Sequence, residues 1–396
     1  MKKVVKKTML IILLSLGLLI TLVFASLLLL SGVFEQQKYL DPWSKEYFSQ
    51  FDDPRIQLAA HGLLAGNGHN MQPWIIKLDK ENPMVFYLYS DSKRMTGEVD
   101  PFSRQMMVTQ GAFLEYVKIA GDYLGYPAEV ELFPQGVFDE MDLIKSMQST
   151  PVAKITLSKT SPLETPLYDY LFMTDTNRSP YKNQQLTMDQ VNELEAVNTN
   201  TDTVVKIYQD PTNIEKLKTY IMNSVIIEAN TDRVMKETEI IFRSNEFKKN
   251  QYRYGFSVEG QGTTGLMGHI IQGLVTLFPS MNSGEAATNN FIKSSQISID
   301  NTSAYAMIFT KDNSIISQVE SGMLYSNLVL TAHKLGIVMQ PMSQPLEEYP
   351  EMNIPYTSIH TDYAYNGSSI QMLLRLGLPE KEAPFSMRQD VMEIIE

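Results

Sequence analysis

The pattern of apolar and polar residues separates one long apolar run from a body of mixed segments. The run extends from Thr8 to Phe34 without a charged residue, and lysines stand before it at positions 2, 3, 6 and 7. About 20 helical residues cross a bilayer core, and positive residues beside a span stay cytoplasmic. The pattern therefore predicts one membrane-spanning helix in residues 1–34. The N-terminus would be cytoplasmic, and the main domain would lie outside the cell membrane.

A cleaved signal peptide is the alternative interpretation of this run. Such peptides have an apolar region of about 7–15 residues that ends at a small-x-small site. Here Ala25-Ser26 lies inside the run and further leucines follow it. This arrangement favours an uncleaved anchor.

Beyond a polar linker at residues 35–50, helical and strand-like segments alternate. Asp53 followed by Pro54 predicts a helix start, and residues 106–123 read as a helix that Gly125 ends. Thr187 and Gln190 form a capping box, and a long helix is expected from Asp210-Pro211 through about Phe242. The expected strands are residues 74–78, 85–88, 130–132, 153–157 and 204–208. This alternation predicts an α/β or α+β class with a layered sheet.

A faint internal repeat has an offset of 211 positions. Gly111 and Leu124-Gly125 recur as Gly322 and Leu335-Gly336, and in both copies the helix leads into a strand. The apolar positions between them also correspond: Phe113, Val117 and Ile119 with Leu324, Leu328 and Leu330. The repeat predicts two related halves, residues 51–165 and 166–396. A glycine-rich insertion at about residues 255–290 interrupts the second half, as either a surface excursion or a lid over a pocket.

Composition narrows the classes of partner. Without the four initial lysines, 29 basic residues face 45 acidic ones, a formal charge of −16 for the rest of the chain. Such a surface disfavours nucleic acid. The chain has no cysteine, and its five histidines show no metal-ligand spacing.

The loop Gly66–Trp74, Gly-Asn-Gly-His-Asn-Met-Gln-Pro-Trp, is the most informative motif of the chain. Its glycines and asparagines favour sharp turns with free amide donors, and the residue before Pro73 is biased away from the helical region. The loop resembles the small-small-x-Asn-x-Gln-Pro-Trp signature of the nitroreductase superfamily, which leans over the ring of FMN.

Four further segments resemble the Acg-type branch of that superfamily, and the likeness covers nearly everything after the apolar run. The segments are Thr176–Tyr181, Asp100–Arg104, Leu335–Leu346 and a C-terminal one in two parts, Leu374–Pro379 and Met387–Asp390. The resemblance implies an α+β, nitroreductase-like fold in which a dimer is fused into one chain, a pseudo-dimer. It also implies a single FMN site built from both halves. Oligomeric state stays open, and a monomer is compatible with this arrangement.

The resemblance implies a set of FMN-binding residues but no catalytic acid or base. Arg178 and Arg388 match phosphate ligands, because arginine binds phosphate bidentately. The loop residues match positions that line the ring, and the segment from Pro341 matches the one beside N5 and O4. The full expected set is Asn67, Gly68, Asn70, Gln72, Thr176, Arg178, Pro341, Ser343, Gln344 and Arg388.

One departure from the family concerns charge. Where many members carry a lysine or arginine near N1 and O2 of the flavin, this chain has Ser179 and, upstream, Asp175. A missing cation would stabilise reduced flavin less. The first hypothesis is a membrane-anchored FMN oxidoreductase that takes electrons from NAD(P)H and reduces a small-molecule acceptor, a quinone or nitroaromatic. The alternative is a protein that binds or sequesters flavin without turnover, and a degenerate scaffold is a third reading.

Overall fold

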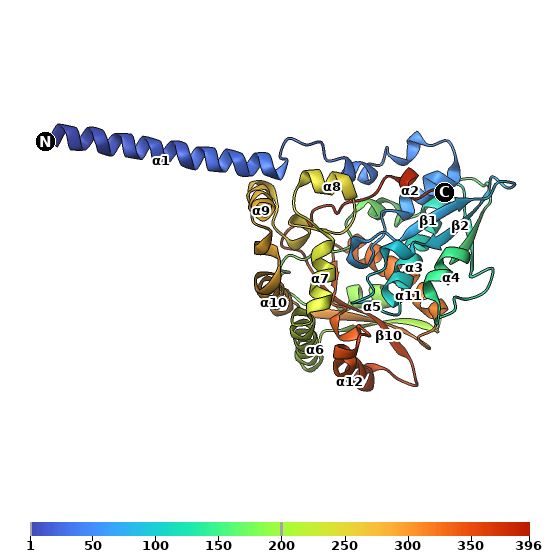
Figure 1. Cartoon of the computed structure of the whole chain (residues 1–396). Helices are drawn as coiled ribbons and strands as arrows, with labels where there is room; N and C mark the ends of the chain where they lie inside the picture. The colour runs from blue at the N-terminus through green and yellow to red at the C-terminus, as the bar shows by residue number, and fades with distance from the viewer. Residues whose placement is uncertain (1, 199–200) are drawn as a thin grey trace.

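The structure is a computed structural model that describes residues 2–198 and 201–396. Helix α1 (Lys2–Ser31) projects from a body that contains all the other elements (Figure 1). Among the described residues, one helical stretch is long and apolar enough to cross a membrane, Val4–Ser31, with a mean hydropathy of 2.8 and 6% of its apolar window buried. The expected apolar helix is therefore present.

The body combines helices with two antiparallel four-stranded sheets, in agreement with the expected mixture of helix and strand. The first sheet has the order β1-β2-β4-β3 and the second has the order β5-β8-β10-β9. The strands of the first sheet are β1 (Trp74–Leu78), β2 (Val85–Ser90), β3 (Ala128–Leu132) and β4 (Ala153–Leu157). Those of the second are β5 (Thr203–Tyr208), β8 (Ala304–Thr310), β9 (Val338–Pro341) and β10 (Ser369–Gly377).

The two sheets have the same strand order when elements are matched along the chain. If β1, β2, β3 and β4 correspond to β5, β8, β9 and β10, both orders read first, second, fourth, third. The long helix α3 (Arg104–Leu124) lies between β2 and β3, and α11 (Ile315–Lys334) lies between β8 and β9. Gly125 and Gly336 follow these helices with φ of 77° and 69°, the left-handed conformation that glycine adopts without strain.

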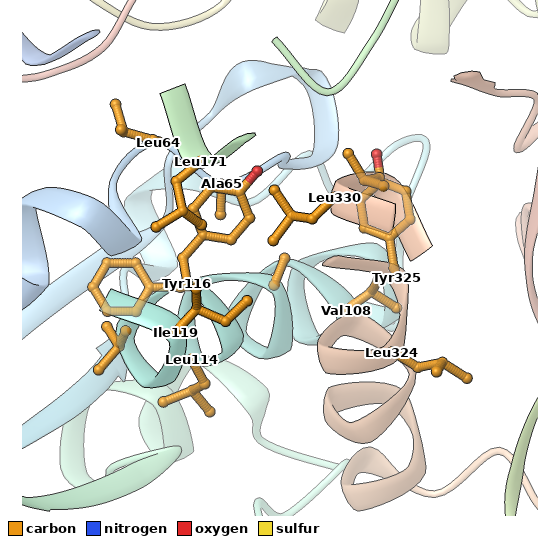
Figure 2. Packing of buried hydrophobic residues seen from close by; sticks show 14 of the residues in the cluster. Leu64, Ala65, Val108, Leu114, Tyr116, Ile119, Leu171, Leu324, Tyr325 and Leu330 are labelled. Atoms are coloured by element: carbon orange, nitrogen blue, oxygen red, sulfur yellow. The ribbon is translucent and has the colours of Figure 1, made fainter. Parts of the chain in front are cut away.

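Helices α3 and α11 cross at the centre of the body, and two glycines allow their close approach. A Cβ at Gly111 would lie 1.8 Å from the Val319 carbonyl oxygen, and one at Gly322 would lie 1.8 Å from that of Val108. The two contacts are reciprocal, because Val108 and Val319 differ by the same 211 positions as the glycines. Figure 2 shows the apolar side chains that pack around this crossing.

Local signals account for several element boundaries. Asp53 caps α2 (Pro54–Gly62) by accepting a hydrogen bond from the Arg55 amide, and Thr187 and Gln190 form the expected box at α5 (Met188–Glu195). The remaining helices of the two sheet-bearing regions are α4 (Leu143–Ser149) and α12 (Asn353–Tyr363).

The connection between β5 and β8 is far longer than that between β1 and β2, and it consists mostly of helices. The helix expected to reach Phe242 ends at Ala229, so that prediction was wrong: α6 (Pro211–Ala229) is followed by a separate α7 (Asp232–Ile240). Asn230 and Thr231 interrupt it, and both side chains bond back to carbonyls four residues earlier. The other elements are β6 (Phe242–Arg243), α8 (Glu246–Tyr252), β7 (Phe256–Ser257), α9 (Gly265–Leu277) and α10 (Gly284–Asp300).

The segment of residues 35–50, which the sequence predicts as a polar linker, contains three buried aromatic side chains. These are Tyr39, Trp43 and Tyr47. The Trp43 indole donates to the Ser386 carbonyl, and the Tyr47 hydroxyl accepts from the Val391 amide. Aromatic side chains therefore fasten this segment to the body.

Residues near position 395 complete the first sheet. Ile395 pairs in parallel with Ile76 of β1, because the Ile76 amide donates to the Ile394 carbonyl and the Glu396 amide donates to the Ile76 carbonyl. The sheet of the first half is thus extended by a segment from the other half.

Candidate functional site

A cavity of about 110 Å³, called the pocket below, lies where the two halves meet. The first half contributes Asn67, His69 and Asn70 of the glycine-asparagine loop. The second half contributes three walls, at residues 174–179, 255–262 and 383–388. Five of the ten expected FMN-binding residues line the pocket: Asn67, Asn70, Thr176, Arg178 and Arg388.

The glycine-asparagine loop has an unusual backbone. His69, Asn70 and Gln72 have φ of 53°, 52° and 51°, the left-handed region, where asparagine is tolerated and other non-glycine residues are uncommon. Each such residue costs of order 1 kcal/mol and persists only where its surroundings determine it. The Gly68 amide donates to Thr109 Oγ1, and the Gln72 amide donates to Asn67 Oδ1. These bonds hold the loop in this shape.

The amide side chains of the loop bind the second half. Asn70 Nδ2 donates to the carbonyls of Gly255 and Met387, at 3.2 and 3.1 Å. Gln72 is buried, and its Oε1 accepts from the Gln389 amide at 2.8 Å. In this structure both side chains join the halves, so any contact of theirs with a ligand would compete with these bonds.

Arg388 lies fully buried beneath the pocket. Its Nη1 donates to Asn70 Oδ1 and its Nη2 to the Leu64 carbonyl, both at 2.9 Å, and the guanidinium stacks on the Trp43 ring at 4.6 Å. Its Nε is buried without a partner. Burial lowers the pKa of Arg388 to about 10, opposed by the negative charge of Asp175. No carboxylate is within ion-pair distance of this cation in the part of the chain that the structure describes.

Arg178 is the second cation of the pocket, and it differs from Arg388 in its exposure and in its lack of hydrogen bonds within the described parts of the chain. Its side chain keeps contact with solvent, and it forms no hydrogen bond or ion pair with the described residues. Enough protein surrounds it that desolvation still lowers its pKa, while Asp175 opposes this effect. Because the Arg178 side chain is exposed in an open depression, its charge stays hydrated.

The charge of Arg178 affects its neighbour His69. Burial lowers the pKa of His69 to about 4, and the nearby Arg178 guanidinium adds to this lowering. The imidazole is therefore neutral at pH 7. It contacts the Phe256 ring edge-on, with 5.4 Å between the ring centroids.

Asp175 is one of two carboxylates that line the pocket, and Glu259 is the other. The Asp175 Oδ2 accepts hydrogen bonds from the Tyr325 hydroxyl at 3.0 Å and from Thr176 Oγ1 at 3.2 Å. The Asp175 carboxylate rests against Gly66, where a Cβ would lie 2.1 Å from the same oxygen. A larger residue at the first small position of the motif would have to displace the Asp175 carboxylate.

The other expected residues lie outside the pocket lining. Gly68 and Gln72 belong to the loop but are not part of the wall. Pro341 pairs with Leu374 at the end of β9, and Ser343 and Gln344 follow it. Gln344 hydrogen-bonds Glu228 on α6, so this segment faces a second buried polar cluster.

Several pocket residues carry no recognisable motif in the sequence. His69 stands inside the motif but was not assigned a role, and Phe256, Ser257 and Glu259 fall in the glycine-rich insertion. The glycines were the only signal there. Gly260 and Gly262 line the pocket, as a lid over it would.

The groups of the pocket fit an anionic ligand such as the phosphate of FMN. Arg178 offers an unpaired guanidinium, and Arg388 offers a buried cation with an unpartnered Nε. The volume fits less well, because ligand pockets usually measure about 300–1,000 Å³. A bound flavin would require the wall at residues 255–262 to move outward, and the glycines of this wall permit backbone rearrangement.

Comparisons with known proteins identify no family. No family model and no curated protein matches the chain. Solved structures similar to it are nitroreductase-like flavoproteins, three of which follow.

A nitroreductase-like family protein from Bacillus cereus is 12% identical, covering 59% of this chain and 96% of its own, with a TM-score of 0.31. The FMN-dependent nitroreductase NfnB from Mycobacterium smegmatis, in complex with NADPH, is 11% identical, covering 52% and 88%, with a TM-score of 0.30. An iodotyrosine deiodinase bound to FMN and 3-iodo-L-tyrosine is 16% identical, covering 56% and 95%, with a TM-score of 0.30. At these scores the likeness assigns neither fold nor activity to this chain.

Proposed function

We propose that this chain is a membrane-anchored, FMN-dependent oxidoreductase of the nitroreductase type, reducing a quinone or nitroaromatic acceptor by two electrons. One observation carries the proposal: the asparagine-rich loop of one half and two arginines of the other, one of them unpaired, border the same pocket. An unpaired cation in a concave site is a ready partner for a phosphate.

The residues of the pocket would have different tasks in holding FMN. Arg178 would bind the phosphate directly, because its guanidinium has no other partner among the described residues. Arg388 would act indirectly, because its Nη1 donates to Asn70 and so holds the loop in place beneath the ligand. Bound FMN supplies a ring that accepts a hydride from NAD(P)H and passes on two electrons. Neutral His69 and Phe256 would form an apolar, water-excluding side of the site.

The single-chain pseudo-dimer is part of the same proposal. It is supported by the matched strand order of the two sheets and by the reciprocal glycine contacts of α3 and α11. A two-fold interface brings the same patches together in this reciprocal way. Fusion of two subunits also explains why the loop occurs in the first half and the arginines in the second.

Anchoring at the cell membrane rests on α1. Its apolar side chains are almost entirely exposed, and burial in lipid would remove them from water. With the lysines on the cytoplasmic side, the pocket would lie in the extracytoplasmic space.

Flavin retention by the full chain tests the proposal. The chain would be purified in detergent, incubated with FMN and desalted. The expected result is an absorbance band at about 450 nm that corresponds to one flavin per chain. Arg178→Gln should lower retention by more than about tenfold, whereas Arg233→Gln, on an exposed arginine paired with Glu98 and Glu351, should leave it unchanged. A colourless wild-type protein would refute the proposal.

A non-catalytic flavin-binding protein is the second candidate, and Asp175 favours it. A carboxylate at the pocket would oppose the negative charge that reduced flavin gathers. Anaerobic mixing of the flavin-loaded protein with NADH and with NADPH separates the two candidates. Bleaching of the flavin supports the enzyme, and persistent colour supports the binding protein.

A further inference from the structure

Helix α9 turns small residues and one glutamine towards the protein interior and apolar residues towards the outside. Its inward residues are Gly268, Gln272, Gly273 and Val275, and a chain of apolar residues faces outward. Leu266, Met267, Leu277 and Phe278 are each more than half exposed, at 58, 57, 53 and 51%. The helix contains no charged residue. An uncharged outer face of this kind is typical of a helix that contacts lipid or another protein.

Helix α9 packs directly against the end of α1. A Cβ at Gly273 would lie 2.3 Å from the Leu27 carbonyl oxygen, so the two backbones touch. In Figure 1, α9 is seen end-on while α1 runs across the picture, so the two helices cross. A helix that crosses a membrane-spanning helix can lie along the membrane surface.

The length of α1 places this crossing at the outer surface of a bilayer. About 20 helical residues fill the hydrocarbon core. Counted from Thr8, the first residue after the lysines, such a span ends at Leu27, which is the residue under Gly273. The exposed Phe247 ring also lies beside Gly32, at 3.1 Å from a Cβ built there. Apolar groups therefore surround the point where α1 would leave the lipid.

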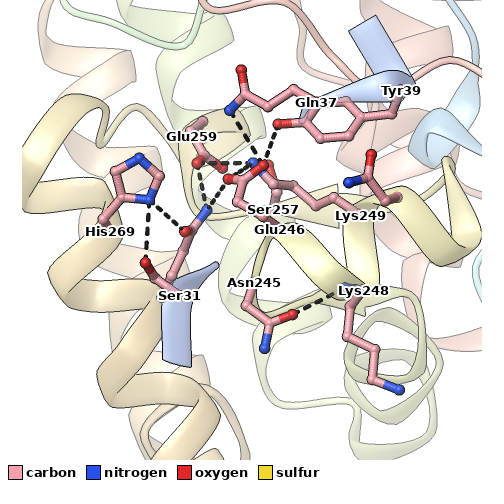
Figure 3. A network of polar contacts seen from close by, with 12 residues as sticks. Ser31, Gln37, Tyr39, Asn245, Glu246, Lys248, Lys249, Ser257, Glu259 and His269 are labelled. Atoms are coloured by element: carbon pink, nitrogen blue, oxygen red, sulfur yellow. Dashed lines mark hydrogen bonds and ion pairs between the residues drawn. The ribbon is translucent and has the colours of Figure 1, made fainter. Parts of the chain in front are cut away.

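A buried polar network connects this region to the pocket wall (Figure 3). On the inner side of α9, Gln272 donates to Glu246 at 3.0 Å and also to Glu259, a pocket residue. Lys249, 2% exposed, pairs with both carboxylates. His269 contacts Ser31 at the end of α1. The network holds α9, the end of α1 and the pocket wall as one unit.

We propose that α9 is a second membrane contact, with its outer apolar face seated in the outer headgroup region of the bilayer beside α1. This inference rests on the proposed membrane anchoring of α1. A second copy of the chain is the rival occupant, but continuity with the point where α1 ends favours lipid. Since Gly260 and Gly262 precede α9 by only a few residues, the pocket wall would lie beside the membrane surface.

Labelling the full chain tests this placement, and the absence of native cysteine makes single labels straightforward. Met267→Cys and Phe278→Cys would carry a polarity-sensitive fluorophore on α9. Leu19→Cys marks the middle of α1, and Ile354→Cys marks α12, where the native side chain is 78% exposed. Each variant is reconstituted into phosphatidylcholine and phosphatidylglycerol vesicles that carry acyl-chain nitroxides.

Lipid nitroxides should quench the labels at 267 and 278 at least about twofold more than the label at 354, and iodide should quench them less. If they respond like the label at 354 while that at 19 is quenched by lipid, the inference is wrong and the anchor stands. If they are shielded from iodide without lipid quenching, protein covers α9, and the inference is again wrong. If the label at 19 is not quenched either, the anchor itself fails.

Discussion

The two halves share a framework but differ in the connection between their first two strands. In the first half, β1 and β2 are joined by residues 79–84, whereas β5 and β8 are joined by a segment containing α6 to α10. The long connection supplies a pocket wall, the buried network and the exposed face of α9. The unequal connection therefore provides most of the surfaces on which the proposed functions rest.

The largest loss of stability is expected from substitutions at the crossing of α3 and α11, where the two halves are in contact. Gly111→Ala and Gly322→Ala each place a Cβ against a backbone carbonyl oxygen, which no side-chain movement can relieve. We expect each to lower the free energy of unfolding by more than about 3 kcal/mol. Gly97→Ala is the control, because a Cβ there meets no atom within 4 Å. Chemical unfolding followed by circular dichroism measures the difference, and a small effect at either glycine would argue against the tight crossing.

Arg388→Gln should cause the next largest loss of stability, because it removes the hydrogen bonds by which Arg388 connects the two halves. The substitution leaves the Leu64 carbonyl and the Asn70 amide oxygen without the donor that Arg388 provides. Hydrogen bonds to charged groups contribute about 1.5–3 kcal/mol each, so a loss of about 3 kcal/mol is expected. The same unfolding assay measures it. An unchanged unfolding midpoint would mean that solvent or neighbours replace these bonds.

Two buried groups, His61 and Glu228, should respond to pH in opposite directions, and His61 is the simpler case. Burial lowers the pKa of His61 to about 4 from an ordinary 6.5. The unfolded chain thus binds the proton first, and stability falls as pH drops from 6.5 towards 4. The change amounts to roughly 2 kcal/mol, discounted for relaxation. His61→Gln should flatten this part of a stability–pH profile, and an unchanged slope would contradict the assignment.

Glu228 of the second half should act in the opposite sense. Burial raises its pKa to about 7 from 4.5, and its Oε2 has no hydrogen-bond partner. The folded state holds the proton more tightly, so its contribution is complete below pH 4.5 and is lost as pH rises through about 7. Glu228→Gln should remove a loss of roughly 2 kcal/mol between these values. Unfolding midpoints at pH 5 and pH 8 report it, and equal losses in both proteins would exclude this carboxyl.

The smallest effect on stability is expected at Arg178. This side chain is exposed and has no bonded partner, so Arg178→Gln should change the free energy of unfolding by no more than about 0.5 kcal/mol. Together with lost FMN retention, an unchanged unfolding midpoint would separate the ligand-binding arginine from the structural one. A strong loss of stability would instead assign Arg178 to the fold.

Local signals in the sequence predicted the local features of the fold. The Asp53 cap, the Thr187 box and the helix end at Gly125 depend on residues within one turn of each other, and the structure confirms all three. The 211-residue offset also located the two glycines that meet at the crossing. The interruption of the helix after Ala229 was missed, because neither proline nor glycine marks it.

The long-range contacts of the site could not be read from one sequence. The motif identified the loop, but the partners of Asn70 and Gln72 lie more than 180 positions away. Arg388 was predicted as a phosphate ligand only because its position matches the family. In the structure its guanidinium donates hydrogen bonds to Asn70 and to the Leu64 carbonyl, so it connects distant segments. The burial of Trp43 likewise depends on Phe385 and Arg388, which no local pattern reveals.

The pairing of Ile395 with β1 has a consequence for how the chain is made. Until that segment leaves the ribosome, the outer edge of the first sheet has no partner, and an open strand edge invites wrong pairing. The first sheet therefore gains this edge contact only after the later part of the chain has been synthesised. If the chain crosses a membrane as proposed, this edge can close only after position 395 has followed it.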